Sequence, residues 1–242
     1  MKQNLFVSIT LLFCLSVGAF AQDRQKMEIE NVVPGVVIVN NIEIQGYIKK
    51  VNSYQSPTTN KLLPCPWELQ SNIKFITKDV FDNSQKLSNK DYTKYDPKNC
   101  QGFKYTSDSE TYIYESVKFD ATTGMGIMPR PMFLRVITSK KIALFHYFTS
   151  EVRISTGDVN LDESEKPQSV YRVGKEGKLK FVLNMSITKE LNDCPIVIER
   201  YGKGNQEDSQ KKGLINSLVK ISDDYRVNRA LRAIEDYNDN CQ

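Results

Sequence analysis

The stretch VVPGVVIVNNIEIQGYIKKV, residues 32–51, decides the fold class of this chain. Apolar residues recur at alternate positions on both sides of Asn40-Asn41, which is the pattern of two strands that each turn one face toward a core. Asparagine tolerates the left-handed backbone that a tight two-residue turn requires. The sequence therefore predicts an antiparallel β-hairpin in this stretch.

Further segments with the character of strands follow along the chain. They centre on residues 73–76, 102–105, 112–117, 133–137, 142–148, 170–173 and 179–183. Residues 52–66, rich in Ser, Thr, Asn and Pro, predict a polar loop. Short strands joined by tight turns favour an antiparallel meander or roll of about eight strands over a parallel, nucleotide-binding sheet.

The hydrophobic period changes from that of a strand toward that of a helix after about residue 186. Asp193, as N-cap before Pro195, predicts a short helix that ends near Gly202. Apolar residues then repeat at helical spacing from residue 214 to residue 237, with a candidate break at 222–224. We therefore predict an α+β protein. Its β region spans residues 22–185, and residues 186–242 form helices packed on that region in the same compact unit.

The first 21 residues have the features of a secretory signal peptide. Lys2 precedes an apolar core from Leu5 to Gly18, and Ala19-Phe20-Ala21 supplies small residues at the cleavage site. The apolar core is shorter than the ~20 residues that a membrane-spanning helix needs. We predict cleavage between Ala21 and Gln22, a periplasmic or secreted mature protein, and no transmembrane segment after the signal peptide is removed.

The charge of the chain argues against a nucleic-acid partner. The sequence has 33 basic and 29 acidic residues, a formal net charge of +4, of which Lys2 is lost with the signal peptide. The charges are mixed along the chain, whereas a nucleic-acid footprint needs clustered Lys and Arg. Export from the cytoplasm points the same way.

Four cysteines remain after the signal peptide, which contains Cys14, is removed. They are Cys65, Cys100, Cys194 and Cys241, and an even number in an oxidising compartment favours two disulfides. Of the three pairings, we favour Cys65 with Cys100 and Cys194 with Cys241, because each pair lies within one predicted structural region. The alternative is a zinc site, but the chain has one histidine and these cysteines form no C-x-x-C pair.

The segment GMGIMPRPM, residues 124–132, is the most unusual internal stretch. Its three methionines, Met125, Met128 and Met132, predict an adaptable contact surface for a protein partner, because thioethers repack easily. Two alternatives are a Cu(I) site, which favours sulfur ligands, and a loop whose methionines fill gaps at the edge of the sheet.

Other patterns give little support to a catalytic or metal site. His146 alternates onto the strand face of Ile142 and Leu144, and no G-x-S-x-G motif accompanies it, so we expect a packed histidine. Residues 158–162 match the first half of a calcium loop, but Glu163 stands where that loop needs glycine. The sequence therefore predicts no metal and no cofactor.

A series of short motifs, taken in order, resembles an uncharacterised family of secreted, envelope-associated bacterial proteins. The motifs are Ile44-Gln45-Gly46-Tyr47-Ile48, Trp67, Ile73-Lys74-Phe75, Gly102-Phe103-Lys104, Phe133-Leu134-Arg135-Val136, Leu144-Phe145-His146-Tyr147, Asp193-Cys194-Pro195 and Tyr237-Asn238 before Cys241. The resemblance implies an exported protein with a β-rich region followed by helices. It supplies no catalytic residues.

These features predict an exported, non-enzymatic protein of the cell envelope that binds a protein partner or a ligand. One alternative is an extracytoplasmic hydrolase, which would need two facing carboxylates with perturbed pKa values in a cleft. Another is a structural accessory of an outer-membrane complex.

Overall fold

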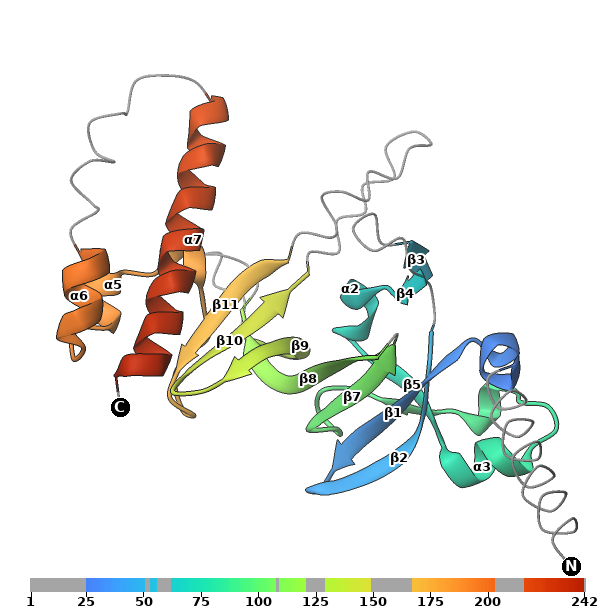
Figure 1. Ribbon diagram of the computed structural model, residues 1–242. Helices are drawn as coiled ribbons and strands as arrows, with labels where there is room; N and C mark the ends of the chain where they lie inside the picture. Colours follow the sequence, from blue (N-terminus) through green and yellow to red (C-terminus); the bar gives the residue numbers. More distant parts are fainter. Residues whose placement is uncertain are drawn as a thin grey trace, which may run out of the picture. The chain divides into compact units, whose positions relative to one another are not determined.

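The computed structural model describes residues 25–50, 53–55, 62–107, 109–120, 129–148, 167–202 and 216–241. Within these residues the chain forms a ten-stranded antiparallel sheet that does not close, with C-terminal helices packed on it (Figure 1). The predicted α+β class is therefore confirmed. The strand order is β12-β11-β10-β9-β8-β7-β1-β2-β5-β6, so strands β7 to β12 form a meander and β1 lies beside β7.

The elements, in chain order, are β1 (Val32–Val39), β2 (Ile42–Lys49), β3 (Ser53–Gln55), β4 (Leu62–Pro64), α2 (Pro66–Leu69), β5 (Ile73–Thr77), α3 (Lys78–Asn83), η1 (Asn89–Asp91), β6 (Thr93–Tyr95), β7 (Gly102–Ser107), β8 (Glu110–Phe119), β9 (Arg130–Ser139), β10 (Ile142–Tyr147), β11 (Gln168–Val173), β12 (Lys180–Phe181), η2 (Val182–Asn184), α5 (Ile187–Glu190), α6 (Pro195–Tyr201) and α7 (Asn216–Asn240). Strands β3 and β4 pair with each other in a separate two-stranded ribbon.

The first hairpin forms as the sequence predicts. Val39 pairs with Ile42, and Asn40 and Asn41 have φ angles of 52° and 63°. Positive φ at both central residues is the requirement of the type I′ turn, whose twist matches that of the flanking strands.

The described residues form two compact units, one up to Tyr112 and one from Ile113 onward. The boundary between the two units falls inside β8. Along that strand the buried residues change parity, from Tyr112 and Tyr114 to Val117 and Phe119. Because successive side chains of a strand point to opposite faces, β8 buries one face in its first half and the other face in its second half.

In the first unit, α3 and η1 cover one end of a sheet face. Phe81 of α3 is fully buried and its ring centre lies 4.0 Å from that of Tyr47 on β2. The cluster is completed by Val32, Ile76 and Tyr92, with Met27 and Leu87 packed against it. Lys26 donates hydrogen bonds to the carbonyls of Phe81 and Ser84 and so fixes the end of α3. Beyond this cluster, the same face is hollowed over β1, β2 and β7.

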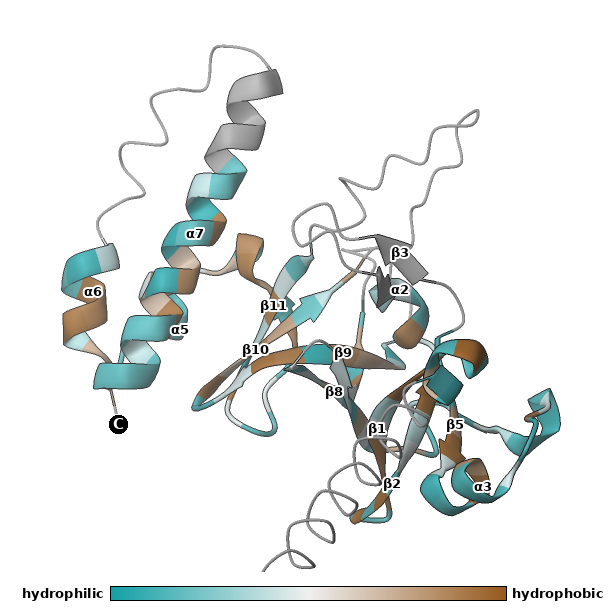
Figure 2. Ribbon diagram, turned by 45° about the vertical axis from the view of Figure 1, so that its right-hand side comes forward, coloured by the Kyte–Doolittle hydropathy of each residue, from teal (hydrophilic) through white to brown (hydrophobic). Residues whose placement is uncertain are grey.

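In the second unit, the helices pack on β10 and β11. The shared core consists of Ile142, Leu144, Tyr171, Val182, Ile187, Leu191, Cys194, Val197, Ala230, Ala233, Ile234 and Tyr237. Figure 2 shows hydrophobic residues in the strands, whereas the coloured turns of α7 are mostly hydrophilic. Its few apolar residues therefore form the face that contacts the sheet. Within the described residues, no helix is both long and apolar enough to cross a membrane.

Several local predictions need correction. The N-cap of α6 is Cys194 rather than Asp193, because the Asp193 carboxylate accepts a hydrogen bond from the hydroxyl of Tyr237 instead. Pro195 does occupy the first turn of α6, as the sequence predicts. Helix α7 continues through residues 222–224 without a break. The polar loop predicted at 52–66 contains the paired strands β3 and β4 and the first residue of α2.

Candidate binding site in the first unit

A hollow with a volume of about 490 Å³ lies over β1, β2 and β7 of the first unit. Its lining comes from these three strands, from the start of α3 and from β8. The lining residues are Pro34, Gly35, Val36, Gln45, Gly46, Tyr47, Lys78, Lys104, Tyr105, Thr106 and Thr111. Its size falls within the ~300–1,000 Å³ of typical ligand pockets.

The hollow lies beside the point where β1 and β7 separate. The paired residues of these strands run from Ile38 with Gly102 to Gly35 with Tyr105, and the pairing ends before Pro34. Proline has no backbone N–H to donate to a neighbouring strand, so it interrupts a ladder at this position. On the other side of β7, the hydroxyl oxygen of Thr106 lies 3.4 Å from that of Thr111.

The floor of the hollow combines apolar and polar side chains. Val36 stands directly opposite Gln45 on β2 and Lys104 on β7, so these three side chains share one face of the sheet. Gln45 is exposed and Val36 is partly buried. An apolar floor with a few polar groups around it is the usual composition of a binding pocket.

The two lysines at the hollow have acidic partners. Lys104 Nζ lies 3.0 Å from both carboxylate oxygens of Glu43, and Lys78 Nζ lies 2.7 Å from Asp82 Oδ2. Their positive charges are therefore balanced locally. The hollow suits a ligand whose bound part is neutral.

Gly46 shapes this part of the sheet from the opposite, buried side. A Cβ atom at this position would lie 2.0 Å from the carbonyl oxygen of Ile76 and 2.6 Å from the ring of Phe75. Only glycine allows β2 and β5 to approach so closely here.

The predicted partner surface is only partly within the described residues. Met125 and Met128 lie outside them. Met132 is on β9, partly buried, and packs against a cluster in the second unit that includes Val117 and Leu134. The predicted partner surface stays a prediction. The calcium-like residues 158–162 also lie outside the described residues.

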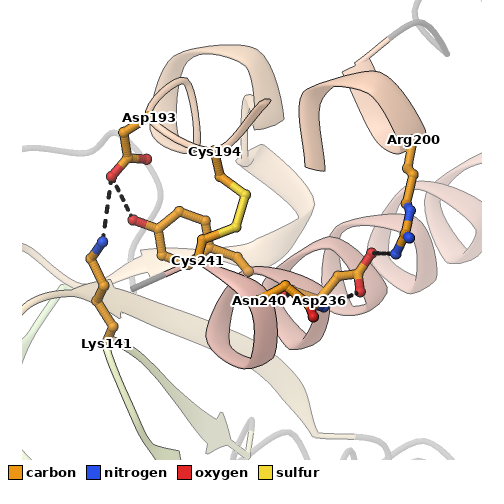
Figure 3. Close-up of a disulfide and its surroundings, with 8 residues drawn as sticks. Lys141, Asp193, Cys194, Arg200, Asp236, Asn240 and Cys241 are labelled. Atoms are coloured by element: carbon orange, nitrogen blue, oxygen red, sulfur yellow. Dashed lines mark hydrogen bonds and ion pairs between the residues drawn. A yellow bond between two sulfur atoms is a disulfide. The ribbon is translucent and has the colours of Figure 1, made fainter. Parts of the chain in front are cut away.

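One of the two predicted disulfides is present. Cys194 and Cys241 are bonded and link the start of α6 to the residue after α7 (Figure 3). Cys65 and Cys100 are separate buried thiols, which corrects the predicted second bridge. The Cys100 thiol donates toward the carbonyls of Gly102 and Ile38, at 3.1 and 3.5 Å. Cys65 lies at the N-cap of α2, and its burial raises its pKa to about 11.

The residues around the disulfide form a polar cluster in the second unit. Asp193 Oδ2 accepts a hydrogen bond of 2.7 Å from the Tyr237 hydroxyl and lies 3.4 Å from Lys141 Nζ (Figure 3). The Tyr237 hydrogen bond, with the positive charge of Lys141, lowers the pKa of Asp193. The Lys141 ammonium also lies 4.8 Å from the ring centre of Tyr237. Each member of this cluster thus has a partner of complementary character.

Asn238 attaches α7 to the edge of β10. Its amide donates to the carbonyl of Ile142 and accepts from the N–H of Ile142, both at 2.9 Å. Lys140, in the preceding turn, lies 2.5 Å from Asp239. The sequence predicts Asp193 as an N-cap and a helical repeat through Tyr237, but not the hydrogen bonds that Asp193, Tyr237 and Asn238 make. Their proximity to Cys241 and Cys194 was the only signal that these segments meet.

His146 lies in the second unit and is largely buried. It pairs with Arg135 on β9 and with Ser169 on β11. Its Nδ1 has no hydrogen-bond partner among the described residues. Burial, with a smaller effect of the Arg135 charge, lowers its pKa to about 4. The imidazole therefore stays neutral at physiological pH. This environment gives the histidine no orienting carboxylate of the kind that a catalytic base uses.

The carboxylates with lowered pKa values have local structural partners. Asp91 accepts hydrogen bonds from the backbone N–H and hydroxyl of Ser88, which lower its pKa. Asp193 belongs to the cluster around the disulfide. Each of these carboxylates is thus held by partners within its own unit.

No family model, curated protein or solved structure matched this chain in comparisons with known proteins. The resemblance to secreted, envelope-associated proteins therefore stays a prediction. Any functional conclusion comes from the residues of the chain itself.

Proposed function

We propose that this chain is an exported, non-enzymatic protein whose first unit binds a ligand or protein partner in the hollow over β1, β2 and β7. The observation that carries the proposal is the hollow itself, which combines apolar side chains with an amide, hydroxyl groups and neutralised lysines. The signal-peptide features of the first 21 residues support the export.

The arrangement favours binding over chemistry. Thr106 and Thr111 offer hydroxyl groups, and Gln45 offers both a donor and an acceptor. The two lysines that line the hollow are paired with carboxylates, so neither offers a free amine as a base, and a hydroxyl without a base is a weak nucleophile. The hollow can therefore recognise a ligand by hydrogen bonding and by contact with Val36 and Pro34.

A photocrosslinking residue placed at Gln45 tests the proposal in cells that express the full chain. Gln45 is exposed on the floor of the hollow, so the probe should capture the occupant and yield an adduct of defined mass. Lys118 provides the matched control, because it is an exposed residue on β8 that does not line the hollow. An adduct at position 45 and none at 118 supports the proposal, whereas equal labelling at both positions contradicts it.

Intact mass tests the export separately. Protein recovered from outside the cytoplasm should begin at Gln22. A full-length chain confined to the cytoplasm would contradict the proposed location.

A further inference from the structure

Three lysines form a row across neighbouring strands of the first unit. Lys74 on β5 stands directly opposite Lys94 on β6. Ile48 on β2 pairs with Phe75, so the next residue of β2, Lys49, lies at the position beside Lys74. Because alternate residues of a strand share a face, Lys49, Lys74 and Lys94 lie on the same face of the sheet.

This arrangement is unfavourable for folding. Like charges directly opposite each other on adjacent strands destabilise a sheet. Neither Lys74 nor Lys94 makes a hydrogen bond or ion pair with the part of the chain that the structure describes. Lys49 donates a hydrogen bond of 3.3 Å to Asn89 and lies 4.7 Å from the ring centre of Tyr92. Neither contact itself supplies a negative charge, but Glu30 and Asp91 lie near Tyr92, and with burial, the larger effect, their charges raise its pKa to about 12.

The aspartates closest in sequence to Lys94 are directed elsewhere. Asp91 accepts hydrogen bonds from Ser88, at 2.6 Å from its N–H and 2.8 Å from its hydroxyl. Asp96 accepts hydrogen bonds from the backbone N–H groups of Lys98 and Asn99, at 2.7 and 3.3 Å. Both carboxylates therefore stabilise turns, and neither forms an ion pair with a lysine of the row in the part of the chain that the structure describes.

Protection of the sheet edge explains only one member of the row. Strand β6 is at the end of the sheet, and an exposed lysine on an edge strand discourages pairing with another chain. Strands β2 and β5 are interior strands. Lys49 and Lys74 therefore need a different explanation.

We propose that Lys49, Lys74 and Lys94 form a docking row for an acidic α-helix of a protein partner. The proposal goes beyond the proposed function, since none of these three lysines lines the hollow. Charge complementarity calls for carboxylates, and the spacing of the row favours a helix. Adjacent strands lie ~4.8 Å apart, so the three lysines span about 10 Å.

A helix matches this spacing better than an extended peptide does. Acidic residues at i, i+4 and i+7 lie on one helix face and span about 10.5 Å at a rise of ~1.5 Å per residue. In an extended strand the side chains on one side are ~6.6 Å apart, so three of them span about 13 Å. The helix axis would run across the strands, along the row of lysines.

The test uses the full mature chain and two synthetic helical peptides of identical composition. One peptide carries Glu at i, i+4, i+7 and i+11, and the other distributes the same Glu residues around the helix. We expect the patterned peptide to bind about tenfold more tightly, and the substitutions K49Q, K74Q and K94Q together to abolish that preference. The matched control K118Q, which removes an exposed lysine on β8, should leave the preference unchanged.

Three results would overturn the proposal. The first is equal affinity for the two peptides, and the second is an unchanged preference in the triple variant. The third is that neither peptide binds, whereas vesicles of anionic phospholipid bind the natural chain but not the triple variant. Circular dichroism and thermal unfolding of the triple variant verify that it remains folded. Crosslinking at Gln45 does not depend on these lysines, so failure of the docking row and failure of the hollow as a binding site are separate outcomes.

Discussion

Helix α7 of the second unit and strands β2, β5 and β6 of the first unit both carry closely spaced polar side chains, but they use them differently. On α7, Tyr237, Asn238 and Asp239 each meet a complementary group, respectively Asp193, the backbone of Ile142 and Lys140. On the strands, Lys74 and Lys94 face each other. Paired polar groups indicate a structural role, whereas like charges that face each other on adjacent strands fit the proposed docking role.

Removal of the disulfide should have the strongest effect on stability. The bond closes a sequence separation of 47 residues, so replacing both Cys194 and Cys241 by Ser should lower the free energy of unfolding by about 2–4 kcal/mol. Urea unfolding measures this change. Reductant should destabilise the natural protein by a similar amount and leave the double variant unaffected. A double variant as stable as the natural protein would contradict the stabilising role of the disulfide.

His146 differs from the paired polar groups of α7, since its Nδ1 is buried without a hydrogen-bond partner among the described residues. Its pKa falls from 6.5 to about 4, so between these values the unfolded chain binds a proton that the folded chain does not. Stability should therefore decrease as the pH is lowered from about 6.5 to 4, by an amount on the order of 3 kcal/mol.

Unfolding measured across this pH range, for the natural protein and for His146→Gln, tests that expectation. The stability of the variant should decrease much less over this pH range, because the chain has no other histidine. The same slope in both proteins would mean that other groups produce it.

Asn238 should contribute less than the disulfide but more than an exposed polar residue. Asn238→Ala leaves the N–H and C=O of the buried Ile142 without these partners, which should cost about 1–3 kcal/mol. Asn240→Ala is the matched control, because Asn240 is exposed and bonds only to Asp236 within the same helix. Equal losses in urea unfolding of the two variants would contradict the role of Asn238 in attaching α7 to β10.

Much of the fold could be predicted because its signals are local. Alternation in residues 32–49 and the asparagine turn determine the first hairpin, and the helical period around Ile234 and Tyr237 identifies the face of α7 that meets the sheet. The pairing of β1 with β7 could not be predicted in this way, because it joins residues more than 60 positions apart. Likewise, nothing in the local pattern places Cys100 beside the carbonyl of Ile38.

The candidate sites could not be predicted from the sequence either, because they also depend on contacts between distant segments. The hollow depends on Pro34 ending the β1/β7 pairing, which becomes visible only when β7 is placed beside β1. Lys49, Lys74 and Lys94 are scattered in the sequence among acidic residues, so the charge pattern along the chain shows no basic cluster. The register of β2, β5 and β6 brings them together.

A paired measurement on Lys74→Glu is the decisive test of the contrast between the two regions. The variant replaces a like-charge pair with Lys94 by an opposite-charge pair, so its free energy of unfolding should rise by about 0.2–1 kcal/mol. The same variant should lose its preference for the patterned acidic helix. We expect the gain in stability and the loss of preference to occur together. A variant that is less stable than the natural protein, or that binds the patterned helix equally well, would refute the binding role of the lysine row.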